Sequence, residues 1–515
     1  MSRRAKPESV RGRDSPKSVT QLVEAPLSQR AARGAGTMAV TQIVRIALQL
    51  AGIVLLARLL MPSDYGLVAM ATALVGIAEV LRDFGLAPAA IQSKTLSDAE
   101  RSNLVWANAA MGFLLSCIVA AASWPIAALY GDPRLIFVVL SLSPVFFING
   151  LSTQFRADLS RSMNFRALAK IDIASQVLAI ATAVGAALIG WGYWAIVGQQ
   201  LVQAIATLIF VVLSVNWRPR RFRREVSIRR FFTYGTGLLG TQLLVYATSN
   251  IDSVLIGARF GPTQLGLYNR AFQMLVLPLN QISSPATRVA LPVLSRIQND
   301  EPSFERYVVR GQLCLSWVVL PVYGFIAANS GSVVKVLLGD QWASAAMIFT
   351  LLAAGGMFQT LSYATYWIFL AKGLTASNLK FALITRTIML AALCLGAVFS
   401  VHAVAAAYSI SLGLIWAFGL IWISRVSEFR SFKSFTAGIS ILSLVGTSSI
   451  VSYLVSGATD HLNVSIQLVL SGGAFLASFA VLCVAVPLLR HQAMEIFSTL
   501  ELIRRRKKPR VVPTT

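Results

Sequence analysis

Several ionisable side chains lie inside long apolar stretches of the sequence, where a charge costs free energy unless it faces a cavity or a partner. Arg45 and Arg386 have no acidic residue nearby in the sequence. Because a guanidinium stays charged and donates paired hydrogen bonds, both favour a watery cavity that receives a phosphate-like anion. The alternative is that both side chains extend to the inner headgroup region. The full set comprises Arg45, Glu79, Arg82, Asp83, Asp252, Arg270 and Arg386.

The other charged residues of this set have two interpretations. Glu79, Arg82 and Asp83 share one helix face by their spacing, so a local ion pair between Glu79 and Arg82 is the first interpretation. Asp252 has a similar alternative, in which it caps or pairs locally with Asn250 and Arg270 as neighbours in the fold. The second interpretation is that Asp252, Glu79 and Asp83 bind H⁺ or Na⁺.

Three prolines stand seven residues apart in one apolar stretch, at Pro278, Pro285 and Pro292. This spacing places them roughly along one face of a helix. Proline bends a membrane helix and frees carbonyl groups that a cavity can use. The stretch is therefore either a passively kinked helix or a bent helix that acts as a gate.

The elements that hold these residues are membrane helices. Soluble domains carry about 25% charged residues, whereas this chain of 515 residues carries 13% and is 56% hydrophobic. A spanning helix needs about 20 mostly apolar residues. We therefore expect an all-α membrane protein with about fourteen spans, at 38–60, 65–91, 103–128, 134–155, 170–190, 193–215, 230–258, 265–293, 309–329, 344–371, 378–399, 402–424, 436–456 and 465–489.

The distribution of positive charge predicts the orientation. The net charge is +24, with 45 Lys and Arg residues. If the amino terminus faces the cytoplasm, nearly all loop charges fall on the cytoplasmic side, as positive-inside topology requires. Nucleic-acid binding is the less favoured explanation, and both termini are expected in the cytoplasm. The predicted outer side carries only Arg58, Arg134, Arg259 and Lys335.

An internal repeat with an offset of about 200 residues predicts two related halves. Leu55, Pro62, Gly66 and Leu67 match Leu255, Pro262, Gly266 and Leu267, Gly131-Asp132 matches Gly339-Asp340, and Lys170 matches Lys380. We expect two pseudo-symmetric six-helix lobes around a central cavity. The predicted organisation is a disordered basic cytoplasmic tail at 1–37, lobes at 38–215 and 230–424, a basic cytoplasmic linker at 216–229, two extra helices within 425–489 and a basic cytoplasmic tail at 490–515.

Several kinds of chemistry are not expected. No phosphate-binding G-x-x-x-x-G-K-[ST] motif occurs. The three histidines are scattered, and the four cysteines form no C-x-x-C pair, so no metal or cofactor is expected. The predicted outer loops are short, which disfavours a membrane-embedded polymerase or ligase.

Two stretches carry a family resemblance. LARLLMPSDYGLVAMATALVGIAEVLRDFGLAPAAIQ, at 56–92, and NIDSVLIGARFGPTQLGLYNRAFQMLVLPLNQISSPATRVALPVLSR, at 250–296, resemble the polysaccharide transporter family, which includes the Wzx O-antigen flippases. The resemblance is greatest to exopolysaccharide and colanic-acid translocases. It implies the fold of the multidrug/oligosaccharidyl-lipid/polysaccharide exporters, and no enzyme activity.

The resemblance also implies a function. Members of this family are expected to move an undecaprenyl-diphosphate-linked oligosaccharide across the bacterial inner membrane for exopolysaccharide or lipopolysaccharide assembly, by alternating access through a cationic cavity. We assign that cavity to Arg45, Arg270 and Arg386. Membrane lipids are expected partners, together with a polysaccharide polymerase and a chain-length regulator.

Two other transporters with this fold remain as alternatives. A lipid II flippase would use the same physics on a different diphosphate lipid. A multidrug or cation antiporter would favour unpaired acids in its cavity, whereas the spans here hold four arginines against three acids. The sequence therefore favours an anionic cargo.

Overall fold

The computed structural model describes residues 42–82, 86–93 and 96–506, and these form helices without strands. The predicted tail at 1–37 and Asp83 lie outside the described residues. Twelve helices of the described part are long and apolar enough to cross a membrane. The chain is therefore a multi-span membrane protein, as its composition predicts.

The twelve candidate spans follow the predicted stretches closely. One of them, Arg134–Arg161, is divided at Ser143 into α5 (Arg134–Leu142) and α6 (Pro144–Arg161), and another, Pro62–Gln92, includes α2 (Pro62–Arg82) and α3 (Leu86–Gln92). The others are Gln42–Leu59, α4 (Asp98–Tyr130), α7 (Phe165–Leu188), α8 (Trp194–Leu213), α10 (Glu301–Ala328), α12 (Ala345–Ala371), α13 (Thr375–Phe399), α14 (Val401–Val426), α15 (Ser431–Ala458) and α16 (Val464–Ala485).

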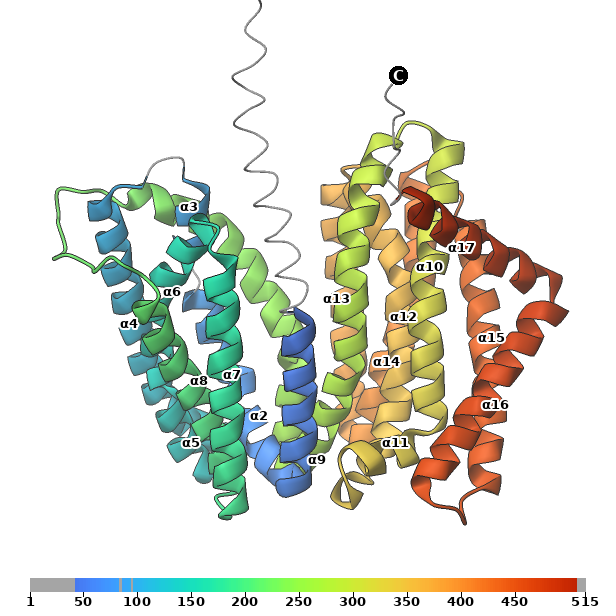
Figure 1. Cartoon of the computed structure of the whole chain (residues 1–515), viewed down its shortest axis with the longest axis horizontal. Coiled ribbons are helices and arrows are strands. Elements are labelled where there is room, and N and C mark those ends of the chain that lie inside the picture. Colours follow the sequence, from blue (N-terminus) through green and yellow to red (C-terminus); the bar gives the residue numbers. More distant parts are fainter. Residues whose placement is uncertain (1–41, 83–85, 94–95, 507–515) are drawn as a thin grey trace, which may run out of the picture.

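The helix α9 (Arg229–Arg296) joins the two halves of the molecule. It reverses direction at Gly261, whose φ of 80° suits glycine, and Pro262 begins the second arm. Its arms coincide with the predicted spans 230–258 and 265–293, although neither is among the twelve. In Figure 1 the arms form a V with its vertex at the lower end, one arm beside α3 and the other beside α10 and α12.

Short breaks separate the other helices at the predicted places. Gly190 and Gly192 both have positive φ between α7 and α8. Ser400 is extended between α13 and α14, and its hydroxyl accepts a hydrogen bond from the Ala403 N–H. These breaks confirm the predicted separation of span 170–190 from 193–215 and of span 378–399 from 402–424, because glycine and a serine cap are ordinary helix ends.

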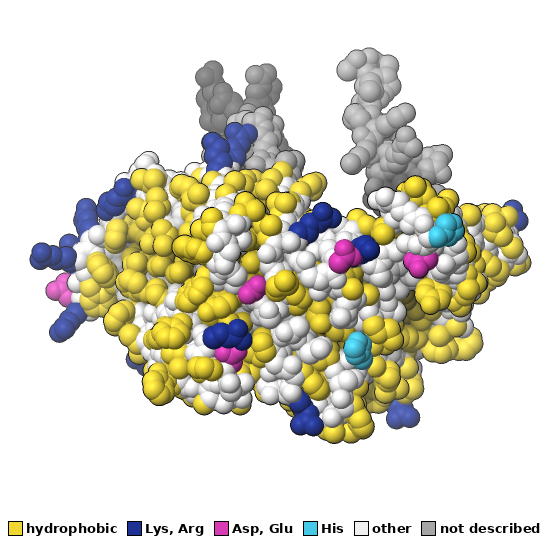
Figure 2. Space-filling view, turned by 90° about the horizontal axis from the view of Figure 1, so that it is seen from below, with side chains coloured by type: hydrophobic (Ala, Val, Ile, Leu, Met, Phe, Trp, Pro, Cys, Tyr) yellow, Lys and Arg dark blue, Asp and Glu magenta, His cyan; other side chains and the backbone are white. Residues whose placement is uncertain are grey.

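The outer surface of the bundle is suited to lipid. Large apolar side chains point away from the protein, among them Trp124 with 73% of its surface exposed and Phe399 with 72%. Seen from the lower end, the surface is mostly hydrophobic or uncharged, with charged side chains scattered across it (Figure 2). Such a surface is stable in a bilayer and would aggregate in water.

The repeated residues meet at the lower end. A Cβ on Gly66 would overlap the carbonyl oxygen of Pro262, and a Cβ on Gly266 would overlap that of Pro62. Close by, the Trp342 indole of η1 (Asp340–Trp342) donates a 2.8 Å hydrogen bond to the Ala57 carbonyl. Short α11 (Ser330–Leu337) precedes η1. The lower end therefore joins the two halves through tight backbone packing.

The segments predicted as a cytoplasmic linker and a cytoplasmic tail are both held by contacts or by helix. The linker at 216–229 is held on α4, where the Asn103 amide donates to the Arg223 and Val226 carbonyls at 2.8 and 3.0 Å. The tail at 490–515 is helical as far as Arg506, within α17 (Pro487–Arg506). Figure 1 places α17 across the upper end of α10 and α15.

Candidate functional site

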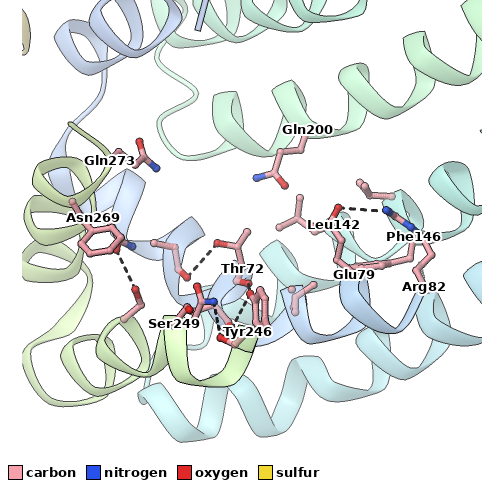
Figure 3. Close-up of a pocket in the computed structure, with 18 of the residues that line it drawn as sticks. Thr72, Glu79, Arg82, Leu142, Phe146, Gln200, Tyr246, Ser249, Asn269 and Gln273 are labelled. Carbon is pink, nitrogen blue, oxygen red and sulfur yellow. Dashed lines mark hydrogen bonds and ion pairs between the residues drawn. The ribbon is translucent and has the colours of Figure 1, made fainter. Parts of the chain in front are cut away.

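Two connected cavities lie among the first helix (Gln42–Leu59), α2, α5, α6, α7, α8 and α9. Their volumes are about 370 and 280 Å³, and they share the lining residues Ala69, Thr72, Gln200, Asn269 and Gln273. Side-chain amides dominate the polar lining, and Figure 3 shows several of them around the open space. We name the combined space the amide chamber, with the amides of Gln49, Asn149, Gln176, Gln199, Gln200, Asn250, Asn269 and Gln273.

Many of these amides have no partner within the protein. The side-chain amides of Gln49, Gln176, Gln199 and Gln200 form no hydrogen bond with another group of the described residues. An unpaired amide inside a membrane bundle is costly unless water or a ligand fills the space beside it. The chamber is therefore a polar, hydrated space.

Arg270 forms part of the chamber wall. Only 6% of its surface is exposed, and its guanidinium carbon lies 3.6 Å from the centre of the Tyr65 ring. One of its nitrogens donates a 2.9 Å hydrogen bond to Gln273 Oε1. No described carboxylate lies within ion-pair distance of Arg270, so its positive charge is stabilised by the Tyr65 ring and the Gln273 amide alone.

The acidic candidates occupy the other side of the chamber. Asp252 is 5% exposed, and its carboxylate accepts a 2.8 Å hydrogen bond from the Tyr268 hydroxyl. It forms no ion pair with Arg270 or any other described residue, so the pairing alternative does not hold for it. Glu79 and Arg82 lie 3.6 Å apart, which is the local ion pair of the first interpretation. Asp83 lies outside the described residues.

Arg45 has a partner that the sequence did not indicate. One of its nitrogens lies 3.5 Å from the Asp172 carboxylate on α7, and Arg156 on α6 lies 2.8 Å from the same carboxylate. Two guanidinium groups therefore share one acid, which leaves a net positive charge. Since Arg45 and Gln49 are four residues apart in one helix, this cluster lies one turn from the amide chamber.

A second cavity, of about 600 Å³, lies among α9, α12, α13 and α14. It contains Arg288 and Arg386, and neither arginine forms an ion pair with a described residue. Tyr363, Tyr366 and Tyr408 are also in its wall. We name it the arginine cavity. It offers two uncompensated guanidinium groups to an anion, with aromatic rings beside them.

The three predicted arginines thus lie in three places. Arg270 lines the amide chamber, Arg386 lines the arginine cavity, and Arg45 belongs to the cluster with Asp172. Sequence reasoning missed Arg288, although it lies within the predicted span 265–293 and follows Pro285 by less than one turn. The signal was available, because Arg288 has no acidic residue nearby in the sequence.

The three prolines all belong to the second arm of α9. Pro285 and Pro292 are exposed. Non-helical backbone angles occur in α9 at Gly261 and not at the prolines. The large change of direction therefore comes from the glycine, and the prolines lie in an arm that continues as a helix.

Comparison with known proteins places this architecture in a family. The model of a family described as polysaccharide biosynthesis protein matches residues 55–347. The teichuronic acid biosynthesis protein TuaB of Bacillus subtilis is 26% identical over 403 residues, with 76% of this chain and 82% of TuaB covered. The lipopolysaccharide biosynthesis protein WzxC of Escherichia coli is 24% identical, with 72% of this chain and 76% of WzxC covered.

The fold also matches a solved structure. The lipid II flippase MurJ in an inward closed conformation superposes with a TM-score of 0.66 at 15% sequence identity. The match covers 86% of this chain and 98% of MurJ. At this identity the likeness concerns the fold alone.

Proposed function

Because this chain belongs to the polysaccharide biosynthesis protein family, we propose that it is a flippase for a polyprenyl-diphosphate-linked oligosaccharide. It moves the headgroup of an undecaprenyl-diphosphate-linked repeat unit from the cytoplasmic to the outer leaflet of the bacterial inner membrane. It serves exopolysaccharide or lipopolysaccharide assembly, and it is a transporter rather than an enzyme. Its relatives TuaB and WzxC carry names from such pathways.

The arginine cavity is the observation that supports this function most strongly. A diphosphate cannot enter hydrocarbon without a large loss of hydration free energy. Arg288 and Arg386 are exposed on the wall of this cavity and offer two guanidinium groups with no carboxylate partner among the described residues, in a bundle whose outer surface is apolar. Such groups lower the cost of moving the diphosphate while its lipid tail stays in the bilayer.

We propose that the architecture follows the predicted lobes. The arms of α9 supply the two spans beyond the twelve, which gives fourteen in total. The first lobe is 38–215, the second is 230–424, and the helices within 425–489 are appended. The reciprocal packing of Gly66 on Pro262 and of Gly266 on Pro62 supports a two-fold relation between the lobes. The tails at 1–37 and 490–515 and the linker at 216–229 face the cytoplasm.

The remaining predicted residues have proposed roles in this cycle. Arg45 and Arg270 add positive charge along the path, beside and within the amide chamber. Asp252 couples the cycle to H⁺ or Na⁺, since it is buried beside a polar chamber without a cationic partner. Glu79 and Asp83 are secondary candidates for this coupling. The arm of α9 with Pro278, Pro285 and Pro292 moves as a gate between the two open states.

A lipid II flippase remains the alternative, because the lipid II flippase MurJ has the same fold. Both functions need a cationic cavity for a diphosphate, so the cavity does not separate them. A multidrug antiporter fits less well, because an arginine pair repels cationic drugs. Polysaccharide polymerase and chain-length regulator remain proposed partners.

Deletion of the gene in its own host tests the function. The expected result is loss of surface polysaccharide and accumulation of lipid-linked repeat units on the cytoplasmic leaflet, both reversed by the wild-type chain. Normal surface polysaccharide in a strain that has no second transporter of this family would contradict the proposal. Growth arrest that is rescued by a known lipid II flippase would favour the alternative.

A further inference from the structure

We propose that the amide chamber is the part of the transport path that recognises the sugars, whereas the arginine cavity holds the diphosphate. The proposal rests on the proposed function and divides its binding site in two. It assigns sugar selectivity to Gln49, Gln176, Gln199, Gln200, Asn269 and Gln273.

The chemistry of the chamber differs from that of the arginine cavity. An amide donates through its NH₂ group and accepts through its oxygen, as a sugar hydroxyl also does. A phosphate only accepts hydrogen bonds, so amide oxygens turned toward it would be unfavourable. The neutral amides of the wall therefore match hydroxyl groups better than they match a diphosphate.

The positions of the amides support a ligand rather than an internal network. Gln176 on α7 and Gln199 on α8 lie on neighbouring helices, yet the side-chain amide of neither forms a hydrogen bond with a described residue. Polar side chains on adjacent membrane helices ordinarily bond to one another. These two instead keep donors and acceptors available on the cavity wall.

The one charge in this part of the wall is also restrained. Arg270 is held over the Tyr65 ring and donates to Gln273, so it fixes the orientation of that amide. With Gln273 Oε1 occupied, the NH₂ group of Gln273 remains to donate into the chamber. Asn269 is fixed in the same way, because the Ser253 hydroxyl donates to its Oδ1 at 3.1 Å. Oriented amides of this kind favour particular hydroxyl positions and therefore selectivity.

Binding by the purified full-length chain separates the two subsites. The first probe is undecaprenyl diphosphate without sugar, and the second is the lipid-linked oligosaccharide pool extracted from the deletion strain. The double variant Gln176→Leu/Gln199→Leu removes two amides and keeps the side-chain size. We expect it to weaken binding of the glycosylated lipid about tenfold, or about 1.4 kcal/mol, with binding of the bare diphosphate unchanged.

Two further variants complete the experiment. Arg386→Gln is expected to weaken binding of both lipids, because both carry the diphosphate. Gln203→Leu is the matched control, since Gln203 is on α8 but lines neither cavity, and it should bind both lipids like the wild type. If the double leucine variant fails to fold, Gln176→Met/Gln199→Met replaces it, and the same selective loss of binding to the glycosylated lipid is expected.

The outcomes separate this inference from the function on which it rests. The sugar assignment would be overturned if the double leucine variant bound both lipids equally more weakly, or bound both as well as the wild type does. In either case the wild type itself must bind both lipids. A wild-type chain that binds neither lipid would overturn the proposed function as well. Selective loss for the glycosylated lipid supports both.

Discussion

The carbonyl oxygen of Pro262 fills the space beside Gly66 that a Cβ would need, and the pair Pro62 and Gly266 repeats this contact. The first turns of α2 and of the second arm of α9 therefore approach each other as closely as their backbones allow. Because the residues are equivalent in the internal repeat, one local packing solution is used twice. This contact closes the lower end of the bundle and makes both glycines sensitive to substitution.

Gly66→Ala is expected to separate the start of α2 from the start of the second arm of α9. A methyl group there overlaps a backbone carbonyl that no side-chain movement relieves, so we expect about 1–3 kcal/mol of destabilisation and weaker closure of the lower end. Gly185→Ala on α7 is the control, because nothing lies within 4 Å of a Cβ at that position. Thermal unfolding in detergent measures the effect, and equal melting temperatures for the two variants would refute the packing argument.

Arg288→Gln and Arg386→Gln are each expected to reduce export at normal membrane levels of the protein. Each removes one of two guanidinium groups that face the arginine cavity. Lysine in place of arginine should restore part of the activity, because it keeps the charge but not the paired hydrogen bonds. Surface polysaccharide relative to membrane-inserted protein is the measurement. Full export by both glutamine variants would contradict the proposal that the diphosphate binds in this cavity.

Asp252→Asn tests ion coupling. The change keeps the size of the side chain and removes its charge, so export should lose its dependence on the proton or sodium gradient. Tyr268→Phe is the comparison, since it removes only the 2.8 Å hydrogen bond to the carboxylate. Export by Asp252→Asn that still responds to both gradients like the wild type would assign Asp252 a structural role.

The short turn between α4 and α5 is expected to contribute to stability in a pH-dependent way. Hydrogen bonds from Arg134 lower the pKa of Asp132 from its usual value. The folded pKa lies below the unfolded one, so this stabilisation is present above the unfolded pKa and is lost as pH falls through the folded pKa. An exposed pair contributes about 0.2–1 kcal/mol.

Asp132→Asn should therefore lower the melting temperature slightly at pH 7, and this decrease should be smaller at pH 3. The same decrease at both pH values would mean that the ion pair contributes nothing.

The sequence predicted the helices well because apolar length and glycine breaks are local signals. The reversal at Gly261-Pro262 falls in the gap between two predicted spans, and the break at Gly190 and Gly192 was expected at those residues. The ion-pair cluster of Arg45, Arg156 and Asp172 was harder to predict, because Asp172 contacts Arg45 only after α7 packs beside the first helix. Long-range pairing of this kind has no local signal in one sequence.

The amide chamber was missed for a different reason. Charged residues stand out in an apolar span because their burial is costly, whereas a glutamine costs less and attracts less notice. Gln49, Gln176 and Gln199 come from separate helices, and only the packed bundle brings them to one cavity. A survey of amides in predicted spans would have found these residues, although it would not have shown that they line the same cavity.

Reconstitution of the purified chain in liposomes tests the central claim most directly. A lipid-linked oligosaccharide placed in one leaflet is followed by a glycosidase that reaches only the other leaflet. The wild-type chain is expected to make the sugar accessible much faster than protein-free liposomes do, and the variant Arg288→Gln/Arg386→Gln is expected to be slow. Equal rates for the wild type and for protein-free liposomes, under an imposed proton or sodium gradient, would contradict flipping through the arginine cavity.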